Sequence, residues 1–394
     1  MHFYNCFFPV VFRYNEAVDK LSLTNELKQQ AQRLGFALTG VCPAIAAPGY
    51  DRFQQWLAAG YAGRMDYLGQ REAAYQHPQH VLDGVRSILM LGMSYHTVEP
   101  TEPQPGQGRI ASYAWGEVDY HDVIHNKLKL LVAWLKEQSP SATTRGVVDT
   151  APLLEREFAQ LASIGWIGKN TLLLNRQHGS YFFLAALLTD VELECDEPFA
   201  ADHCGTCTAC LEACPTDAFT QPYVLDATKC ISYLTIELRE EIPSHLREGV
   251  GDWLFGCDVC QQVCPWNSHA VPAASAAFQP LKERNPVDLI PLFELDDAAF
   301  RTMFRRTPLW RSKRRGILRN AAVVLGNRPT NDAIAALVKG LNDAEPLVRG
   351  ACAWALGKYD CDNALQSLNS RREVELDAMV VRELDSALVR SGEL

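Results

Sequence analysis

The chain has 394 residues, of which 47% are hydrophobic and 21% are charged, and its formal net charge is −10. This length allows two or three domains with buried cores, and no run of about 18 uncharged apolar residues suggests a helix that crosses a membrane. An evenly spread negative charge would also argue against nucleic-acid binding, so a local excess of basic residues would be informative.

The first 20 residues are apolar but differ from a signal peptide. They begin MHFYNCFFPVVF and lack both a basic start and a small-residue cleavage site. We interpret residues 1–20 as an N-terminal extension without a function of its own, and we expect a cytoplasmic protein. In such a reducing compartment the 13 cysteines, an odd number, are less suited to disulfides than to metal binding.

Residues 21–195 alternate between helical and strand patterns. Apolar residues recur at helical spacing in 23–36 and 123–138, which predicts two helices. A short apolar run at 85–95 predicts a buried strand, and residues 179–193 predict a pair of strands. This alternation predicts an α/β or α+β sheet domain.

An acidic side chain follows a predicted strand in the segment VVDTAP. Val147 and Val148 are apolar, and they deliver Asp149 to the end of the strand, ahead of a predicted helix. Capping that helix is the ordinary role of an aspartate at such a position. The functional alternative is a carboxyl group at the mouth of a pocket, where it can donate a proton. Farther along, the segment GWIGKN places Lys169 and Asn170 after two flexible glycines.

Residues 109–128 concentrate aromatic side chains, Tyr113 among them. Aromatic residues at such spacing often belong to a core, and His121 is as readily a structural histidine as a functional one. The triplet DYH that starts at Asp119 begins like the cobalamin-binding motif D-x-H-x-x-G, but Ile124 occupies the glycine position. A cobalamin bound here would therefore lack a protein histidine on its cobalt. The sequence contains no phosphate-binding loop, nucleophile elbow or convincing dinucleotide fingerprint.

Cysteines are concentrated between residues 204 and 264. The first group matches the run Cys-x2-Cys-x2-Cys-x3-Cys-Pro of bacterial ferredoxins, in which three thiolates hold one [4Fe–4S] cluster and the fourth reaches a second cluster. A second copy, GCDVCQQVCPW, begins at Gly256 and lacks its first cysteine, since Leu254 occupies that position. Cys230 is the natural replacement, and it completes the eight thiols that two clusters need.

The spacing assigns these thiols to two [4Fe–4S] clusters. Cluster 1 takes Cys204, Cys207, Cys210 and Cys264. Cluster 2 takes Cys214, Cys230, Cys257 and Cys260. A zinc ribbon is the alternative, but it would leave Cys210, Cys214 and Cys264 without a role. Because two clusters form a path for single electrons, residues 196–290 are predicted to be a ferredoxin-like domain.

Basic residues gather in one stretch of the chain. Residues 301–319 contain eight arginines and lysines, no acidic residue, and the aromatic residues Phe304 and Trp310. A solvated basic face is the simple interpretation. The contrast with an otherwise acidic chain favours a phosphate-binding surface.

Residues 291–394 carry an internal repeat. An arginine, small residues and then Leu-Gly recur 31 residues apart, ending at Gly326 and at Gly357. Such a period indicates HEAT-like helical pairs, which bury their apolar faces by stacking. A scaffold for protein contacts and a platform for a polyanion are both open at this point.

Four blocks of the sequence together resemble the epoxyqueuosine reductase family. They are residues 149–175, 204–219, 226–239 and 256–267. The cysteine motif alone occurs in many redox proteins, whereas CISYLTIEL at this distance before GCDVCQQVCPWN is much more specific. The resemblance covers nearly the whole chain after residue 20. It implies an α+β fold class with a nitroreductase-like cobalamin domain (21–195), a ferredoxin-like domain with two clusters (196–290) and a HEAT-like tRNA-binding domain (291–394).

The resemblance implies an enzyme that removes an epoxide from the modified wobble guanine of a tRNA. Its substrate would be tRNA bearing epoxyqueuosine, and reduction by two electrons would leave the alkene of queuosine. Cobalamin would be a further cofactor, and the two clusters would supply it with electrons from an external low-potential donor. The aspartate that gives the proton in this family matches Asp149, and we expect burial to raise the pKa of its carboxyl group.

The resemblance also indicates where cobalamin and tRNA would bind. The expected cobalamin contacts are Tyr113, Asp149, Lys169, Asn170, Ser232 and Asp258. The expected phosphate contacts are Arg305, Arg306, Arg311, Lys313, Arg314 and Arg315. We expect a monomer without a membrane partner. Two alternatives stay open, namely a cobalamin-dependent reductive dehalogenase acting on a small molecule and an electron carrier without catalytic activity.

Overall fold

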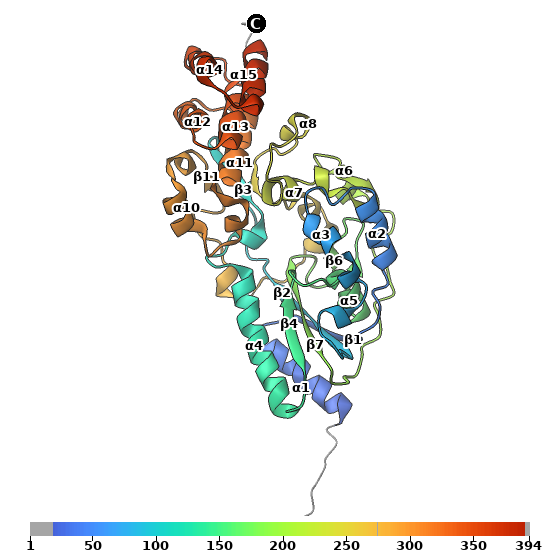
Figure 1. The fold of residues 1–394 in the computed structure, drawn as a ribbon. Helices are drawn as coiled ribbons and strands as arrows, with labels where there is room; N and C mark the ends of the chain where they lie inside the picture. The colour runs from blue at the N-terminus through green and yellow to red at the C-terminus, as the bar shows by residue number, and fades with distance from the viewer. Residues whose placement is uncertain (1–18, 274, 391–394) are drawn as a thin grey trace, which may run out of the picture.

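The computed structural model describes residues 19–273 and 275–390. Of the N-terminal extension predicted for residues 1–20, residues 1–18 lie outside this range, and Asp19 caps the first helix by accepting a hydrogen bond of 3.3 Å from the Ser22 amide. Figure 1 shows a sheet domain at one end of the molecule and a stack of helices at the other. No helix within the described ranges is long and apolar enough to span a membrane.

An antiparallel sheet of four strands forms the centre of the N-terminal half. Its order is β1-β2-β7-β4. The strands are β1 (Leu38–Pro43), β2 (Ser87–Ser94), β4 (Thr144–Val148) and β7 (Phe182–Thr189). The strand predicted at 85–95 is confirmed as β2. The pair of strands predicted at 179–193 is wrong, because this segment forms the single long strand β7, which pairs with β2 along one edge and with β4 along the other.

Helices cover both faces of the sheet. All residues of β2 are buried, and since neighbouring side chains of a strand point to opposite faces, this strand contributes to two cores. Leu89 faces the core that contains α1 (Lys20–Arg33) and α4 (Tyr120–Gln138). Met90 faces the core that contains α5 (Glu155–Leu161). The two long helices, α1 and α4, lie where the helical spacing predicted them.

The thiol-bearing segment forms a module of short elements. Its helices are α6 (Ala209–Glu212), α7 (Ile231–Ile236), α8 (Ser244–Arg247) and α9 (Val259–Gln262). Its strands are β8 (Phe219–Gln221), β9 (Val224–Leu225) and β10 (Trp253–Phe255). The strand β10 pairs with β3 (Gln107–Ile110), which also pairs with β11 (Val287–Asp288). One hydrophobic core therefore continues across the boundaries predicted near residues 195 and 290.

The N-terminal region also reaches over the module through short elements. These are α2 (Tyr50–Ala58), α3 (Asp66–Gln70), β5 (Trp166–Ile167) and β6 (Leu173–Leu174). The Trp56 indole N–H donates to the Leu225 carbonyl at 2.6 Å, and the Ala227 amide donates to the Tyr61 carbonyl at 3.0 Å. These contacts enclose the space between the sheet and the module.

The C-terminal third is a stack of helices. They are α10 (Asp297–Phe304), α11 (Lys313–Asn327), α12 (Ile334–Leu341), α13 (Pro346–Leu356), α14 (Asp362–Val374) and α15 (Ala378–Arg390). The two repeat glycines lie where inner helices approach closely. A Cβ on Gly326 would lie 2.5 Å from the Trp354 ring, and one on Gly357 would lie 2.7 Å from the Ala387 side chain. This stacking is HEAT-like, as the 31-residue period predicted.

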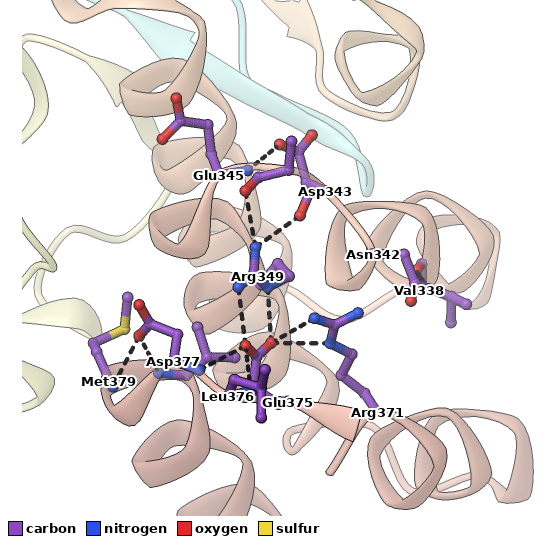
Figure 2. Close-up of polar contacts among 12 residues, drawn as sticks. Val338, Asn342, Asp343, Glu345, Arg349, Arg371, Glu375, Leu376, Asp377 and Met379 are labelled. Atoms are coloured by element: carbon purple, nitrogen blue, oxygen red, sulfur yellow. Dashed lines mark hydrogen bonds and ion pairs between the residues drawn. The ribbon is translucent and has the colours of Figure 1, made fainter. Parts of the chain in front are cut away.

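The arginine of each repeat is buried and makes several hydrogen bonds. Arg349 donates to both carboxylate oxygens of Glu375, at 2.8 and 2.9 Å (Figure 2). Hydrogen bonds from Arg349, then from the Asp377 amide and Arg371, lower the pKa of Glu375 to about 2, although burial opposes them. Arg319 donates to the Leu234 carbonyl in α7 at 2.6 Å. The repeat arginines therefore join the stacked helices to one another and to the thiol module.

Candidate active site

Four thiols surround a cavity of about 220 Å³ in the module. They are Cys204, Cys207, Cys210 and Cys264, the set predicted for cluster 1. Burial and then the neighbouring thiols of Cys264 and Cys204 raise the pKa of Cys210, which reflects how close these side chains lie. Thiolates gathered in this way need a positively charged partner such as an iron centre.

The other four thiols line a second cavity of about 410 Å³. They are Cys214, Cys230, Cys257 and Cys260, the set predicted for cluster 2. Burial and then the nearby Cys230 raise the pKa of Cys260. Among the described residues, no three Cys, His, Asp or Glu side chains converge closely enough to hold a single metal ion. Four thiols around one hollow match the number of cysteine ligands that a [4Fe–4S] cluster takes.

Asn170 and Lys169 lie beside the thiols. Asn170 lines both thiol cavities, and its side-chain nitrogen lies 3.4 Å from the Cys260 carbonyl oxygen. Lys169 donates to the Gly205 and Cys207 carbonyls at 2.6 and 3.0 Å. Lys169 thus holds the loop of the first thiol set. Lys169 lines the smaller cavity, and its predicted contact with cobalamin stays a prediction.

The second cavity extends from the thiols toward the sheet domain. Tyr113 and Tyr120 line it, together with Ser232 and Asp258 from the module. Asp258 is buried, and its Oδ2 accepts a hydrogen bond of 2.6 Å from the Ser112 amide. Burial raises the pKa of Asp258 to about 6. Four of the predicted cofactor contacts meet in this cavity, namely Tyr113, Asn170, Ser232 and Asp258.

A third cavity of about 840 Å³ adjoins the second. Its walls come from α2, from the β8–β9 hairpin and from the loop that leads from β4 into α5, and Asp149 is one of its lining residues. The two cavities share the side chains of Glu155, Arg156, Thr171 and Leu225. Together they form one hollow, which runs from the second thiol set to Asp149 and has the size and mostly apolar lining of a cofactor site.

Asp149 follows the last residue of β4 and faces this hollow. The N-cap of α5 is Leu154, so the structural alternative of a helix cap does not apply to Asp149. Its Oδ2 accepts a hydrogen bond from the Tyr120 hydroxyl, and its Oδ1 lies 2.6 Å from His121 Nε2. Because the side chain is 36% exposed, a molecule in the hollow can reach the carboxyl group.

His121 lies between two carboxyl groups. Its Nε2 faces Asp149, and its Nδ1 lies 2.6 Å from Asp119 Oδ1. Asp119 is the N-cap of α4, so the start of that helix fixes the position of the imidazole. Burial acts to lower the pKa of His121, but the hydrogen bonds to Asp119 and Asp149 outweigh it and raise this pKa to about 9. The imidazole is therefore protonated at neutral pH.

The pKa of Asp149 is lowered, which corrects the expectation from the sequence. Burial acts to raise the pKa of this carboxyl group, as expected. The hydrogen bonds from His121 and Tyr120 and the positive charges of His121 and Arg311 outweigh burial. The proton of the pair accordingly rests on the imidazole of His121, and Asp149 is a carboxylate in this arrangement. Sequence reasoning missed His121 as the partner of Asp149, although the D-x-H spacing that caps α4 was visible.

Arg311 reaches this pair from the C-terminal stack. It lies in the 3-10 helix η8 (Pro308–Ser312), and its Nη2 is 2.6 Å from His121 Nε2. Its guanidinium carbon lies 5.9 Å from the centroid of the Tyr120 ring. Besides burial, the charge of Arg311 is what acts to lower the pKa of His121. The sequence placed Arg311 among the phosphate contacts, and no local signal indicated that residues 190 positions apart meet.

Four of the six predicted phosphate contacts are exposed. They are Arg305, Arg306, Lys313 and Arg315. The Lys313 ammonium lies 4.0 Å from the centroid of the Trp310 ring. Arg314 instead forms a two-point ion pair with Asp343 inside the stack. Arg311 and Arg314 are held by partners within the protein, whereas these four side chains reach the surface, where Arg315 also lies 3.9 Å from Glu345.

Three protein-family models match separate parts of the chain. Residues 203–267 match a 4Fe-4S double cluster binding domain, residues 76–150 match the family described as epoxyqueuosine reductase QueG, DUF1730, and residues 310–388 match HEAT repeats. The chain therefore contains an iron–sulfur double-cluster domain, and the eight thiols of both cavities fall within it.

Relatives of established name extend the likeness over most of the chain. The epoxyqueuosine reductase of Pseudomonas aeruginosa (strain PAO1) is 38% identical over 346 residues, which are 86% of this chain and 96% of that protein. The epoxyqueuosine reductase of Escherichia coli (strain K12) is 36% identical over 348 residues, which are 87% of this chain and 91% of that protein.

Solved structures resemble the whole architecture. A crystal structure of epoxyqueuosine reductase with an epoxyqueuosine-modified tRNA stem loop has a TM-score of 0.87 and 30% identity, and the match covers 94% of this chain and 99% of that one. Epoxyqueuosine reductase from Bacillus subtilis, with its catalytic aspartate loop swung out of the active site, has a TM-score of 0.86 and 29% identity over 93% of this chain and 98% of that one.

Proposed function

The chain belongs to the epoxyqueuosine reductase family, and we propose that it reduces the epoxyqueuosine of a tRNA to queuosine. One observation carries this proposal. The hollow between the sheet and the module joins the second thiol set to Asp149, so electrons and protons can reach the same bound molecule. Removal of an epoxide oxygen as water consumes two electrons and two protons. The second thiol set would supply electrons at one end of this hollow, and Asp149 would supply a proton at the other.

We propose that the two thiol sets hold one [4Fe–4S] cluster each. When bound, the clusters would supply single electrons to the hollow. Cys207 of the first set is exposed, whereas the second set lines the hollow, so an external low-potential donor would dock beside the first set. Asn170 lines both cavities and Lys169 fixes the loop of the first set, and these two residues would therefore keep the sets close together.

The hollow also fits a cobalamin. Its wall carries the buried Oε1 of Glu155, which has no hydrogen-bond partner among the described residues, as expected of a site shaped for a ligand. Tyr113, Ser232 and Asp258 would contact the corrin on the side of the second thiol set. When bound, cobalamin would supply a strongly reducing cobalt centre beside the epoxide. His121 would not bind the cobalt, because both of its ring nitrogens face carboxyl groups.

His121 and Asp149 would deliver one of the two protons. At neutral pH the imidazole of His121 is protonated, and its Nε2 lies 2.6 Å from Asp149 Oδ1. His121 would first protonate Asp149 Oδ1, and a substrate oxygen that enters the hollow beside this oxygen would then take that proton, which leaves His121 neutral and Asp149 a carboxylate. The adjacent positive charge of Arg311 opposes the imidazolium form of His121 and so favours this transfer.

The exposed cations at the start of the helical stack would bind the tRNA backbone. Arg305, Arg306, Lys313 and Arg315 flank Arg311, which itself reaches the catalytic pair. A tRNA held by these side chains would lie next to the hollow, and the wobble nucleotide would have to leave its stack to enter it. We also propose that the chain acts as a monomer in the cytoplasm, where tRNA is modified.

Anaerobic reconstitution followed by a tRNA assay tests the function. The chain is loaded with iron, sulfide and cobalamin, reduced, and mixed with tRNA that carries epoxyqueuosine; the nucleosides are then analysed by mass spectrometry. We expect about eight irons and one cobalt per chain and conversion to queuosine. A Cys257→Ala variant should lose about four irons, whereas Cys195→Ala, outside both sets, should keep all of them. Iron without cobalt would indicate an electron carrier, and a fully loaded chain that leaves the epoxide intact would overturn the proposal.

A further inference from the structure

Glu155 is an acid on the wall of the hollow to which the reaction described above assigns no task. It is the first residue of α5 and lines both halves of the hollow. Its Oε1 is buried and accepts no hydrogen bond from the described residues. The neighbouring Arg156 does not satisfy it, because that guanidinium donates to the Thr171 carbonyl at 2.9 Å.

A charged carboxylate would be costly at this position. An ionised oxygen that is buried without a donor loses its hydration, whereas a neutral carboxylic acid loses much less. Burial and then the negative charge of Asp149 raise the pKa of Glu155 to about 8, although Arg156 and His121 oppose the shift. Tyr75 is a further titratable group close to Glu155. At neutral pH the side chain is therefore mainly a neutral acid.

Other acids on this wall are already engaged. Asp258 accepts a hydrogen bond of 2.6 Å from the Ser112 amide, and Glu157 pairs with Arg52 at 2.7 Å. Asp149 is bonded to Tyr120 and His121. Glu155 differs from these three because its buried oxygen is left for a molecule in the hollow.

We propose that Glu155 supplies the second proton of the reduction, at the place where the two cavities meet. This inference rests on the proposed function. In that reaction both C–O bonds of the epoxide break, a C=C bond forms, and the oxygen leaves as water. The two electrons come from the low-potential donor through the thiol sets. One proton comes from the His121–Asp149 pair, and Glu155 provides the other.

Infrared titration of the full chain tests the protonation of Glu155 independently of turnover. The carbonyl stretch of a neutral carboxylic acid should disappear with a midpoint near pH 8. The signal should be absent from Glu155→Gln and present in Glu192→Gln, which removes an exposed acid paired with Arg86. The same signal in Glu155→Gln would overturn the inference.

Single-turnover conversion of the tRNA tests the role in the reaction. Glu155→Gln should keep its iron, cobalt and tRNA affinity but convert the epoxide about 10²- to 10⁴-fold more slowly. Glu155→Asp, which retains an acid, should recover part of this loss. The step of the wild-type rate with a midpoint near pH 8 should be missing from Glu155→Gln, while the step near pH 9 remains. A wild-type rate and pH profile in Glu155→Gln would overturn the second-proton role. An inactive wild-type enzyme would instead overturn the proposed function, and the role of Glu155 with it.

Discussion

A network of arginines and carboxylates in the helical stack differs from the network in the hollow. In the stack, Glu375 receives hydrogen bonds from Arg349 and Arg371 and from the Leu376 and Asp377 amides, and its side chain is 2% exposed. In the hollow, the carboxylate of Asp149 contacts the Tyr120 hydroxyl and the His121 imidazole, and its side chain is 36% exposed. The buried Oε1 of nearby Glu155 has no hydrogen-bond partner among the described residues.

The difference separates a structural network from a reactive one. Since donors surround Glu375, its carboxylate has one protonation state over the usual pH range, and the pKa of about 2, set first by Arg349, reflects this. The hollow instead holds a histidine with a pKa raised to about 9 by its carboxylate partners, against burial, next to an acid with a pKa raised to about 8 by burial. Incomplete pairing allows protons to move there, as catalytic proton transfer requires.

Replacing the carboxylate in the hollow should have the largest effect. Asp149→Asn keeps the shape of the side chain but cannot pass a proton, so we expect turnover to fall about 10²- to 10⁴-fold. The variant should bind iron, cobalt and tRNA as the wild type does, and its melting temperature should be nearly unchanged. Measurement of single-turnover rates at matched cofactor content checks this, and an unchanged rate would remove Asp149 from the reaction.

Breaking the structural network should give the opposite pattern. Glu375→Gln leaves buried arginines without a countercharge, and loss of one partner of a buried ion pair costs about 3–5 kcal/mol of unfolding free energy. Turnover per folded molecule should not change. Denaturant unfolding checks the loss, with Glu373→Gln, an exposed position in the last turn of α14, as the control.

The stability of the helical stack at low pH should also depend on Glu375. Because the pKa of Glu375 is lowered in the folded state, first by Arg349, its stabilising effect is complete above the unfolded pKa of 4.5. This effect should be lost as pH falls from there toward 2. The Glu375→Gln variant should lack this component of acid unfolding, and an acid profile identical to that of the wild type would contradict the structural role.

The pH dependence of turnover should distinguish the two proton carriers in the hollow. The wild-type rate should fall in two steps, with midpoints near 8 for Glu155 and near 9 for His121. Besides burial, Arg311 acts to lower the pKa of His121, so Arg311→Ala should move the second midpoint to higher pH and leave the first in place. A pH–rate series on both proteins measures this, and a shift of the first midpoint alone would contradict the assignment.

Loss of a single exposed cation should have the smallest effect. Arg315→Ala should weaken tRNA binding several-fold and reduce the slope of log affinity against log salt by about 1, because one phosphate contact is lost. Arg314→Ala should instead lower stability, since Arg314 pairs with Asp343. Binding isotherms over a range of salt concentrations, with Arg86→Ala on the sheet domain as the control, check both statements.

The sequence predicted features that depend on spacing. The eight thiols from Cys204 to Cys264 line two cavities in the two groups of four that the spacing indicated, and the cluster in each group stays a prediction. The period that ends at Gly326 and Gly357 predicted the stacked helices, because each glycine allows the next helix to approach. The helices α1 and α4 were predictable because apolar residues at helical spacing mark one face of each helix.

Features that depend on tertiary contacts were not predictable in this way. The pKa of Asp149 is lowered because His121 and Tyr120 from α4 and Arg311 from the stack converge on it against burial, and no spacing in the chain encodes that meeting. Lys169 proved to hold the loop of the first thiol set through backbone carbonyls, which carry no sequence signature. The strand β7 appeared as two strands because a strand buried on both faces shows no alternation of polar residues.

The mass of the wobble nucleoside after reaction tests the central claim most directly. With the reconstituted and reduced chain, we predict that epoxyqueuosine in tRNA loses one oxygen atom and becomes queuosine, and that the yield depends on both thiol sets. A nucleoside that keeps its epoxide oxygen after incubation with a fully loaded, reduced chain would contradict the account.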